Sequence, residues 1–455
     1  MYFILLFLTT VHISLQTSVI IIGISVSSVL TQTPSKRAFL SNDKEQKGRE
    51  DIDHISDLPN SVICHILSFL YVASVTSSVL SKRWINLWTI VPALSFRSSE
   101  FTTGFVDCVC KVLALSRAQT IHQFSLDFES MEKVDAQNIS PWTSVAIKHN
   151  VQELELNFCT SSPILVTLAA HVFSCKTLVC LKLFDDIYLD ALVNVCLPSL
   201  RILQIECVHS DGSFDRLLSS CPILKDLIRI TVKGPSTENG FYKLLINAPM
   251  LETMKLLDLT DCNVQVGDLP NLVEAAIDLD ILYEDGLGVL FRKIGNLKFL
   301  SLSDSTFGST RFRLQFPMFS NLVCLEITTC CELWYAQIHL LRCADNLKAL
   351  VFHINVPLYH LGRKCIETLP ETAPKCVVAS LKTLKLTGFF DQGCNRKLVR
   401  YVLKNAEVLK ELKIGTSLRL KNRCRHLKNL LKCPKASTAC EIGFFIDSSG
   451  QKYNL

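Results

Sequence analysis

The segment "LVCLKL" at residues 178–183 carries the pattern that decides the fold, an L-x-x-L-x-L arrangement of apolar positions. Related segments begin at residues 121, 151, 200, 224, 251, 272, 297, 322, 347, 381 and 409. The second and third leucines, Leu181 and Leu183, alternate with polar positions as in a short strand with one buried face, and Leu178 covers the core from the preceding turn. Because one such unit cannot bury its own apolar face, the repetition predicts units stacked into a parallel sheet with one continuous core.

The segments recur about every 25 residues, which is the period of leucine-rich repeats. In four units a proline lies two residues before the first leucine and is expected to stop a preceding helix. These are Pro198, Pro222, Pro249 and Pro270. Cys159 and Cys330 follow the last apolar strand position by about three residues, where such repeats favour Asn or Cys. The uneven spacing predicts a curved solenoid of parallel strands and irregular helices.

Composition excludes several classes of protein. The 455 residues are 49% hydrophobic and 20% charged, which indicates a globular rather than a disordered chain. The net charge of +5 is small for this length, so no nucleic-acid partner is expected. Lys and Arg outnumber acidic residues between Arg396 and Lys435. We expect a solvated helix face beside Leu403, Leu409 and Leu412, with contact to a nucleic acid or an acidic partner as the alternative.

The twenty cysteines are predicted to be reduced and mostly buried. No CxxC pair is present, and zinc sites usually need two ligands one turn apart. Cys64, Cys180, Cys324 and Cys376 lie among apolar residues, where a thiol behaves as a small hydrophobic side chain. This usage predicts a cytoplasmic or nuclear protein, with secretion as the alternative.

Residues 1–35 form an apolar leader without Lys, Arg, Asp or Glu. Its length would suffice to cross a bilayer, which takes about 20 apolar residues, and it lacks the basic start of a signal peptide. Lys36 and Arg37 would hold the following chain on the cytoplasmic side. The leader is predicted to be a membrane anchor with a cytosolic body, or a segment outside the working protein. Residues 36–50 form a polar linker.

Residues 51–95 contain two short amphipathic patterns, each with large apolar side chains at helical spacing. The first includes Leu58, Val62, Ile63, Ile66, Leu67 and Leu70, with Pro59 in its first turn. The second includes Val75, Val79, Leu80, Trp84, Leu87 and Trp88. Two short helices cannot bury this much apolar surface on each other, so an interface with another protein is expected.

These residues also carry a family resemblance. "DHISDLPNSVICHILSFL" (53–70) and "SVLSKRWINLWTIVPALSF" (78–96) resemble the F-box of the plant F-box/FBD/leucine-rich-repeat proteins. "YVLKNAEVLKELKI" (401–414) and "CPKAST" (433–438) resemble the FBD domain at the C-terminal end of the proteins of that family. The resemblance implies that the F-box binds a Skp-type adaptor, which links it to a cullin-based ubiquitin ligase. It assigns the adaptor contact to Leu58, Pro59, Ile63, Ile66, Leu67, Leu70, Val79, Leu80, Trp84, Leu87 and Trp88.

The predicted fold is therefore α/β, with a small helical F-box at 51–95, a leucine-rich-repeat region at 96–375 and an FBD segment at 376–446 that continues the array. The chain lacks the GxxxxGK[ST], HExxH and GxSxG motifs. Single histidines such as His171 and His353 are expected to be surface or satisfied core groups. We expect no catalytic residue, no metal and no cofactor.

The resemblance implies a substrate-recognition subunit of an SCF-type ubiquitin ligase whose repeats bind a protein target that the sequence does not identify. Candidate target contacts are exposed strand residues such as Glu155, Lys182, Gln204 and Glu326. Two alternatives remain open. One is a leucine-rich-repeat scaffold outside any ligase, with residues 1–35 as the only membrane attachment. The other is an array that binds a small molecule to complete its target surface.

Overall fold

The computed structural model describes residues 58–68, 84–101, 103–128, 133–159, 166–185, 187–189, 194–206, 208–210, 214–230, 232–233, 242–260, 262–280, 284–303, 306, 316–329, 334–354, 369–389, 393–416 and 430–446. The predicted leader and linker, residues 1–50, lie outside these ranges. The chain forms two compact units, one with residues up to Ser95 plus Ser116–Ala118, the other with Phe96–Leu115 and the chain from Gln119 onward.

The first unit contains two described helical elements. Helix α2 (Asn60–Leu67) follows Pro59, whose carbonyl oxygen accepts hydrogen bonds from the backbone N–H groups of Val62 and Ile63 at 3.0 and 3.1 Å. Since Pro59 lies just outside the helix, its missing N–H costs no helical bond. The second predicted helix is described only from Trp84, where η2 (Trp84–Ile90) is a 3-10 helix rather than an α-helix.

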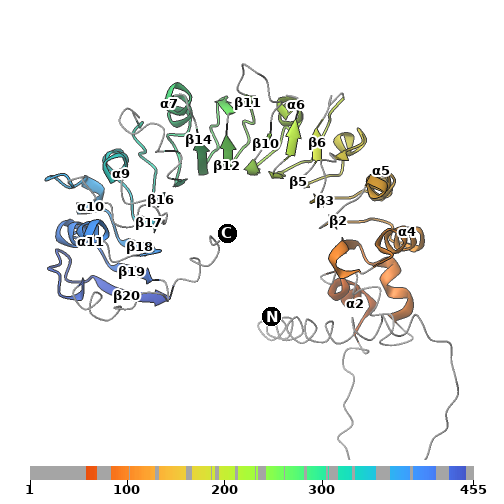
Figure 1. Ribbon diagram of the computed structural model, residues 1–455, viewed down its shortest axis with the longest axis horizontal. Helices are drawn as coiled ribbons and strands as arrows, with labels where there is room; N and C mark the ends of the chain where they lie inside the picture. The colour runs from red at the N-terminus through yellow and green to blue at the C-terminus, as the bar shows by residue number, and fades with distance from the viewer. Residues whose placement is uncertain are drawn as a thin grey trace, which may run out of the picture. The chain divides into compact units, whose positions relative to one another are not determined.

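The chain forms one 14-stranded sheet whose strand order follows the chain, and the second unit contains this sheet from its second strand onward, while the first strand begins before Phe96 (Figure 1). Its strands are β1 (Ala93–Arg97), β2 (Gln123–Phe128), β3 (Glu153–Phe158), β5 (Cys180–Asp185), β7 (Ile202–Glu206), β9 (Asp226–Ile230), β12 (Thr253–Thr260), β14 (Glu274–Asp280), β15 (Phe299–Leu302), β16 (Cys324–Thr329), β17 (Ala349–Ile354), β18 (Thr383–Thr387), β19 (Glu411–Thr416) and β20 (Glu441–Ile446). From β2 onward neighbouring strands pair in parallel, and each L-x-x-L-x-L segment supplies one of them. The predicted parallel repeat array is confirmed.

Register stacks the leucine positions into continuous buried columns. Leu181 pairs with Leu154 on one side and Leu203 on the other, and all three are at most 1% exposed. Fully burying such a side chain contributes about 1.5–3 kcal/mol. Because each strand lends its leucines to both neighbours, no unit holds its core alone.

The turns before the strands correct one expectation. Pro198, Pro222, Pro249 and Pro270 are exposed and each begins a two-residue turn closed by a backbone hydrogen bond to the following leucine. In the Pro249 turn, Leu251 N–H donates to the carbonyl of Ala248 at 3.0 Å. Proline suits this second turn position because its fixed φ matches the turn. The helix-stopping role was wrong for Pro249 and Pro270, because strands rather than helices precede them.

Helices and short strands lie on the outer side of the curved sheet (Figure 1). The helices are α4 (Phe105–Leu115), α5 (Lys133–Lys148), α6 (Phe214–Ser219), α7 (Glu284–Lys293), α9 (Trp334–Arg342), α10 (Lys375–Ala379) and α11 (Gly393–Asn405), with the 3-10 turns η3 (Ser98–Glu100) and η4 (Val172–Ser174). A second sheet has the order β10 (Val232–Lys233), β8 (Val208–Ser210), β6 (Ile187–Leu189) and β4 (Val166–Thr167). Strands β11 (Tyr242–Ile246) and β13 (Cys262–Val266) form a third. These outer strands were not predicted.

In the C-terminal part of the array the described elements are α10, β18, α11, β19 and β20, in that chain order. Helix α11 buries Leu398, Val399, Val402 and Leu403, so it closes the outer side of the core there. Strand β20 ends the sheet, and its Ile446 is 57% exposed. Among the helices that the structure describes, none has the length and apolar character needed to cross a bilayer.

Candidate functional site

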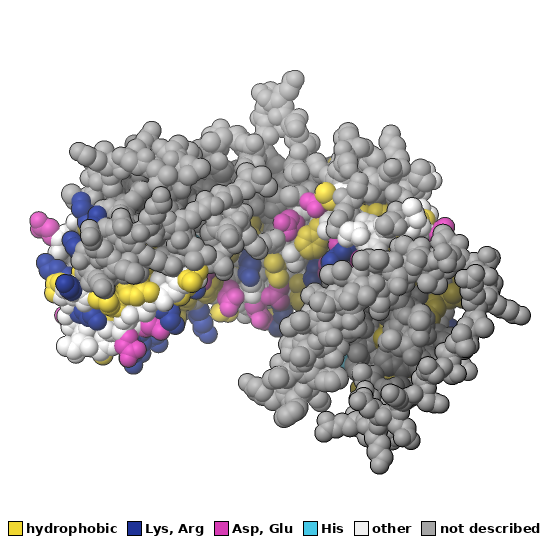
Figure 2. All heavy atoms as spheres, turned by 60° about the horizontal axis from the view of Figure 1, so that its bottom comes forward, with side chains coloured by type: hydrophobic (Ala, Val, Ile, Leu, Met, Phe, Trp, Pro, Cys, Tyr) yellow, Lys and Arg dark blue, Asp and Glu magenta, His cyan; other side chains and the backbone are white. Residues whose placement is uncertain are grey.

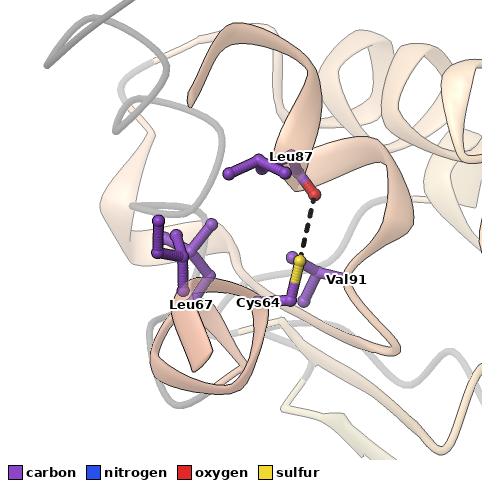
Figure 3. Packing of buried hydrophobic residues seen from close by; sticks show 5 residues of the cluster. Cys64, Leu67, Leu87 and Val91 are labelled. Atoms are coloured by element: carbon purple, nitrogen blue, oxygen red, sulfur yellow. Dashed lines mark hydrogen bonds between the residues drawn. The ribbon is translucent and has the colours of Figure 1, made fainter. Parts of the chain in front are cut away.

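The F-box-like segment builds a small core from both of its helices. Ile63, Cys64, Leu67, Leu87 and Val91 are at most 9% exposed and form one cluster. Figure 3 shows α2 facing the η2 segment, with the Cys64 thiol donating to the carbonyl oxygen of Leu87 at 3.9 Å. The two helical elements are therefore held together by apolar contacts.

The residues expected to contact an adaptor fall into three groups. Ile63, Leu67 and Leu87 belong to the cluster, with exposed fractions of 0, 0 and 6%. Leu58 is half-buried and packs on the cluster, Trp88 is half-buried, and Pro59 is exposed. Ile66 and Trp84 are described in backbone only, whereas Leu70, Val79 and Leu80 lie outside the described residues. The structure thus gives part of the predicted set a role in this unit's own core.

Among the described residues of this unit, two large aliphatic side chains are exposed. Val62 on α2 is 41% exposed and Ile90 at the end of η2 is 46% exposed. Val62 belongs to the apolar stripe of the sequence but not to the predicted contact set, and Ile90 belongs to neither. The signal for Val62 was present in the helical spacing, which does not distinguish the inner from the outer edge of a wide stripe.

The inner face of the array presents a row of side chains between the two buried leucine columns. On successive strands this row contains Ser125, Glu155, Lys182 and Gln204 in register. Glu326 lies in the corresponding row beside Ser301. All four predicted target-contact residues are half-buried, so each is accessible to a partner only in part.

Charges near the beginning of the array are paired across strands. Lys182 Nζ lies 3.0 Å from Glu155 Oε2, and Lys225 Nζ lies 2.6 Å from Glu252 Oε1. Burial alone would lower the pKa of Lys182, but the hydrogen bond and charge of Glu155 outweigh it, so that pKa is raised. Lys182 therefore stays charged, and both ion pairs join neighbouring strand regions.

Asp127 is the centre of a further polar network on this face. Arg97 Nε donates to Asp127 Oδ2 at 3.0 Å, and Asn157 Nδ2 donates to Asp127 Oδ1 at 3.0 Å. The carboxylate uses both oxygens within the array, so its charge is compensated locally.

Several described thiols are buried in the core of the array. The described cysteines carry no disulfide, and burial raises the pKa of Cys180 to about 11 and of Cys221 and Cys376 to about 12. Such thiols are protonated at neutral pH and poor nucleophiles. Cys324 is only half-buried, which corrects the expectation of a buried thiol there, and Cys159, at the repeat position that favours Asn or Cys, is exposed. No cluster of His, Cys, Asp and Glu that could hold a metal occurs in the described part of the chain.

The histidines named from the sequence have ordinary partners. His171 Nε2 lies 3.1 Å from Ser144 Oγ, and burial lowers its pKa. His353 Nδ1 lies 2.8 Å from Thr387 Oγ1. Both positions agree with the expectation of satisfied surface or core groups.

The basic run between Arg396 and Lys435 is divided by the fold. Lys397, Arg400 and Lys404 are exposed on α11, whose other side is buried, as expected for a solvated helix face. Lys410 and Lys413 instead lie at and within β19, on the sheet. The described basic side chains of this run therefore lie on two elements, a helix and a strand.

Comparison with known proteins identifies the repeat and C-terminal parts. Residues 139–281 match a family model described as "FBD-associated F-box protein At5g56370, LRR repeats", and residues 369–414 match the FBD model. The chain is 30% identical over 445 residues to the F-box/FBD/LRR-repeat protein At4g00160 of Arabidopsis thaliana, covering 87% of this chain and 95% of that protein. It is 31% identical over 367 residues to the F-box/LRR-repeat protein At4g14103 of the same plant, covering 69% of this chain and 95% of that one. With a parallel repeat array, a C-terminal FBD match and these relatives, the chain belongs to the plant F-box/FBD/LRR-repeat family.

Proposed function

We propose that this chain is the substrate-recognition adapter of an SCF-type ubiquitin ligase. Its F-box segment would dock on a Skp-type adaptor, and through it on a cullin, while the repeat array binds a protein target. Support comes from family membership and from one structural observation. The core of the F-box segment uses Ile63, Leu67 and Leu87, yet leaves Val62 and Ile90 exposed. Exposed apolar side chains beside a small packed core are typical of an interface.

The free energies of burial and of association decide how many residues the docking surface must contain. Burying one exposed aliphatic side chain completely gains about 1.5–3 kcal/mol, and association costs several kcal/mol or more. Val62 and Ile90 are each about half exposed already, so their contribution alone does not cover that cost. Docking therefore needs further contacts. We assign them to Pro59, to the exposed part of Trp88 and to the residues after Leu67 that the family resemblance places in the adaptor contact.

In this role the chain makes and breaks no bond. By binding the target and the ligase at once, it would raise the effective concentration of target lysines near a ubiquitin carrier. Linked binding sites bring such effective concentrations to the millimolar range or above. The inner face of the array, with its half-buried polar row, is the surface proposed to bind the target.

The test compares two matched substitutions in the full chain. Val62→Asp places a charge in the proposed interface, whereas Val289→Asp makes the same change on α7 of the array, where Val289 is 42% exposed against 41% for Val62. We expect Val62→Asp to weaken binding to a purified Skp-type adaptor by about 2 kcal/mol, because a charge at a desolvated contact is costly. Val289→Asp should bind as the unmodified chain does, measured by calorimetry.

Failure of the unmodified chain to bind any Skp-type adaptor would contradict the proposal and favour the scaffold alternative. Equal loss in both variants would indicate a general effect on folding instead of an interface. Substitutions of Ile63, Leu67 or Leu87 are unsuitable for this test, because they remove the core of the segment itself.

A further inference from the structure

Three lysines at the strand starts near the end of the array lie side by side. The backbone N–H of Lys382 donates to the carbonyl of Lys348 at 2.8 Å, and that of Lys410 donates to the carbonyl of Lys382 at 2.8 Å. Adjacent strands are about 4.8 Å apart, so the three side chains emerge at that spacing. All three are exposed.

A second basic row lies on the inner face of the same strands. Lys385 of β18 pairs in register with Lys413 of β19, and both are exposed, while Leu384 and Leu386 are buried on the opposite face. Lys348, Lys382, Lys385, Lys410 and Lys413 are called the lysine ladder below. Its positions come from three strands, and only the last two belong to the basic run of the sequence.

An aromatic ring borders the ladder. Lys385 Nζ lies 5.6 Å from the centre of the Phe445 ring, which comes from β20. Gly415 allows this arrangement, because a Cβ there would lie 2.5 Å from the Phe445 ring. Gly443, opposite Lys413 in the register, has open space where its Cβ would be. Beside Lys413 the surface is thus open at Gly443 and covered by the Phe445 ring at Gly415.

Among the described residues, one acidic side chain, Glu411, forms an ion pair with a ladder lysine. Glu411 Oε1 lies 2.8 Å from Lys413 Nζ, Asp345 pairs with Lys375 at 3.7 Å, and Glu407 and Glu441 are exposed nearby. Lys348, Lys382 and Lys410 have no side-chain hydrogen bond or ion pair within the described residues. In Figure 2 several Lys and Arg side chains, with Asp and Glu side chains among them, are visible toward the left end, where Figure 1 places the last strands.

We propose that the lysine ladder binds an acidic segment of the target protein. Like charges placed side by side across strands destabilise a sheet, so an anionic partner would relieve a cost that the fold itself does not remove. This inference rests on the proposed target-binding role of the array and adds the chemistry of the target. A protein segment is favoured over nucleic acid because the ladder is short, offers one neighbouring aromatic ring for stacking, and is separated from the lysines of α11 by the thickness of the array.

The test uses the full chain and a synthetic peptide of twelve glutamates, with a twelve-glutamine peptide as the neutral probe. One variant carries Lys382→Gln, Lys385→Gln and Lys410→Gln. The control carries Lys397→Gln, Arg400→Gln and Lys404→Gln, which removes the same charge from exposed positions on α11. Fluorescence anisotropy at low and at physiological salt measures binding.

We expect the glutamate peptide to bind and the ladder variant to weaken it at least about fivefold, with a smaller salt dependence, because several exposed charge pairs are lost. The α11 control should change affinity less than twofold. The proposal is overturned by equal weakening in both variants, by absence of binding at low salt, or by an oligonucleotide that binds the ladder more tightly than the peptide. Adaptor binding by the ladder variant is measured in parallel. Adaptor binding should be unchanged in this variant, so a failure of the peptide-binding proposal can be distinguished from a failure of the proposed ligase docking.

Discussion

The strands near the beginning of the array and those near its end have the same buried leucine columns but opposite arrangements of surface charge. In the first half of the sheet, Lys182 pairs with Glu155 and Lys225 with Glu252 across neighbouring strands. Near the end, Lys348, Lys382 and Lys410 follow one another on neighbouring strands. Unlike charges hold strands together, whereas like charges directly beside each other push them apart.

This difference separates two uses of the same scaffold. In the early strands the surface charges contribute to the stability of the sheet and are satisfied within it. In the last strands the buried core must hold the sheet together against its own surface. The comparison predicts that core substitutions have equal effects in both regions, while charge substitutions have effects of opposite sign.

The largest expected effect concerns the shared core. Leu183→Ala in β5 and Leu386→Ala in β18 each remove a side chain that is 0% exposed. We expect each to lower the free energy of unfolding of its region by about 3 kcal/mol, from lost burial and the cavity left behind. Hydrogen exchange of strand amides checks this region by region. A loss below about 1 kcal/mol in one region only would show that the two cores are not equivalent.

A second effect distinguishes two glycines with positive φ. A Cβ on Gly388, at φ +64°, would meet the backbone carbonyl of Ile354, whereas a Cβ on Gly104, at φ +78°, would meet nothing within 4 Å. Both alanine substitutions incur the left-handed strain of about 1–2 kcal/mol. Gly388→Ala should cost at least about 1 kcal/mol more, because backbone cannot move aside as a side chain can. Urea unfolding of both variants measures the difference, and equal costs would contradict it.

A third effect is a pH dependence common to both regions. Burial raises the pKa of Cys221 and of Cys376 to about 12, whereas an unfolded thiol has a pKa of about 8.5. Their contribution to stability is fully present below pH about 8.5 and is lost as pH rises toward 12, by about 1.4 kcal/mol per pH unit for each thiol. Cys376→Ala should flatten the decline measured between pH 8.5 and 9.5, and an unchanged decline in this variant would contradict the assignment.

The sequence was sufficient to predict the main strands, because two buried leucines alternating with polar residues define a strand of one buried face. It did not predict β4, β6, β8 and β10, which have only two or three residues each and so carry no periodic signal. Strand β13 did carry one, since Val264 and Val266 are buried and alternate with polar residues. That signal was missed because it lacks leucines.

The candidate surfaces were less predictable, because both depend on three-dimensional neighbours. Adjacent residues of α2 separate into buried Ile63 and exposed Val62, and only packing against η2 decides between them. Lys404 and Lys410 are close in sequence but lie on a helix and on the sheet, whereas Lys348 and Lys382 are distant in sequence and meet. Charge clusters of a repeat protein follow its register, not its chain order.

The fourth prediction removes one of the paired charges near the beginning of the array. Glu155→Gln should lower the free energy of unfolding by about 0.5–1 kcal/mol, since it breaks a half-buried ion pair with Lys182. Glu326→Gln is the matched control, because Glu326 is also half-buried but has no ion pair among the described residues. Chemical unfolding at low ionic strength would reveal the difference, which should shrink in 1 M salt.

The smallest expected effect has the opposite sign. Lys382→Glu places an acid between Lys348 and Lys410, so two repulsive neighbours become attractive and the free energy of unfolding should rise by about 0.3–0.5 kcal/mol. Lys397→Glu on α11 controls for the change in total charge. The same Lys382→Glu substitution should weaken binding of the glutamate peptide, because it adds a repulsive charge within the ladder. If the ladder is retained for an acidic partner, the Lys382→Glu variant should be more stable than the natural chain and should bind the glutamate peptide more weakly. Loss of both stability and binding would show that Lys382 stabilises the fold and nothing more.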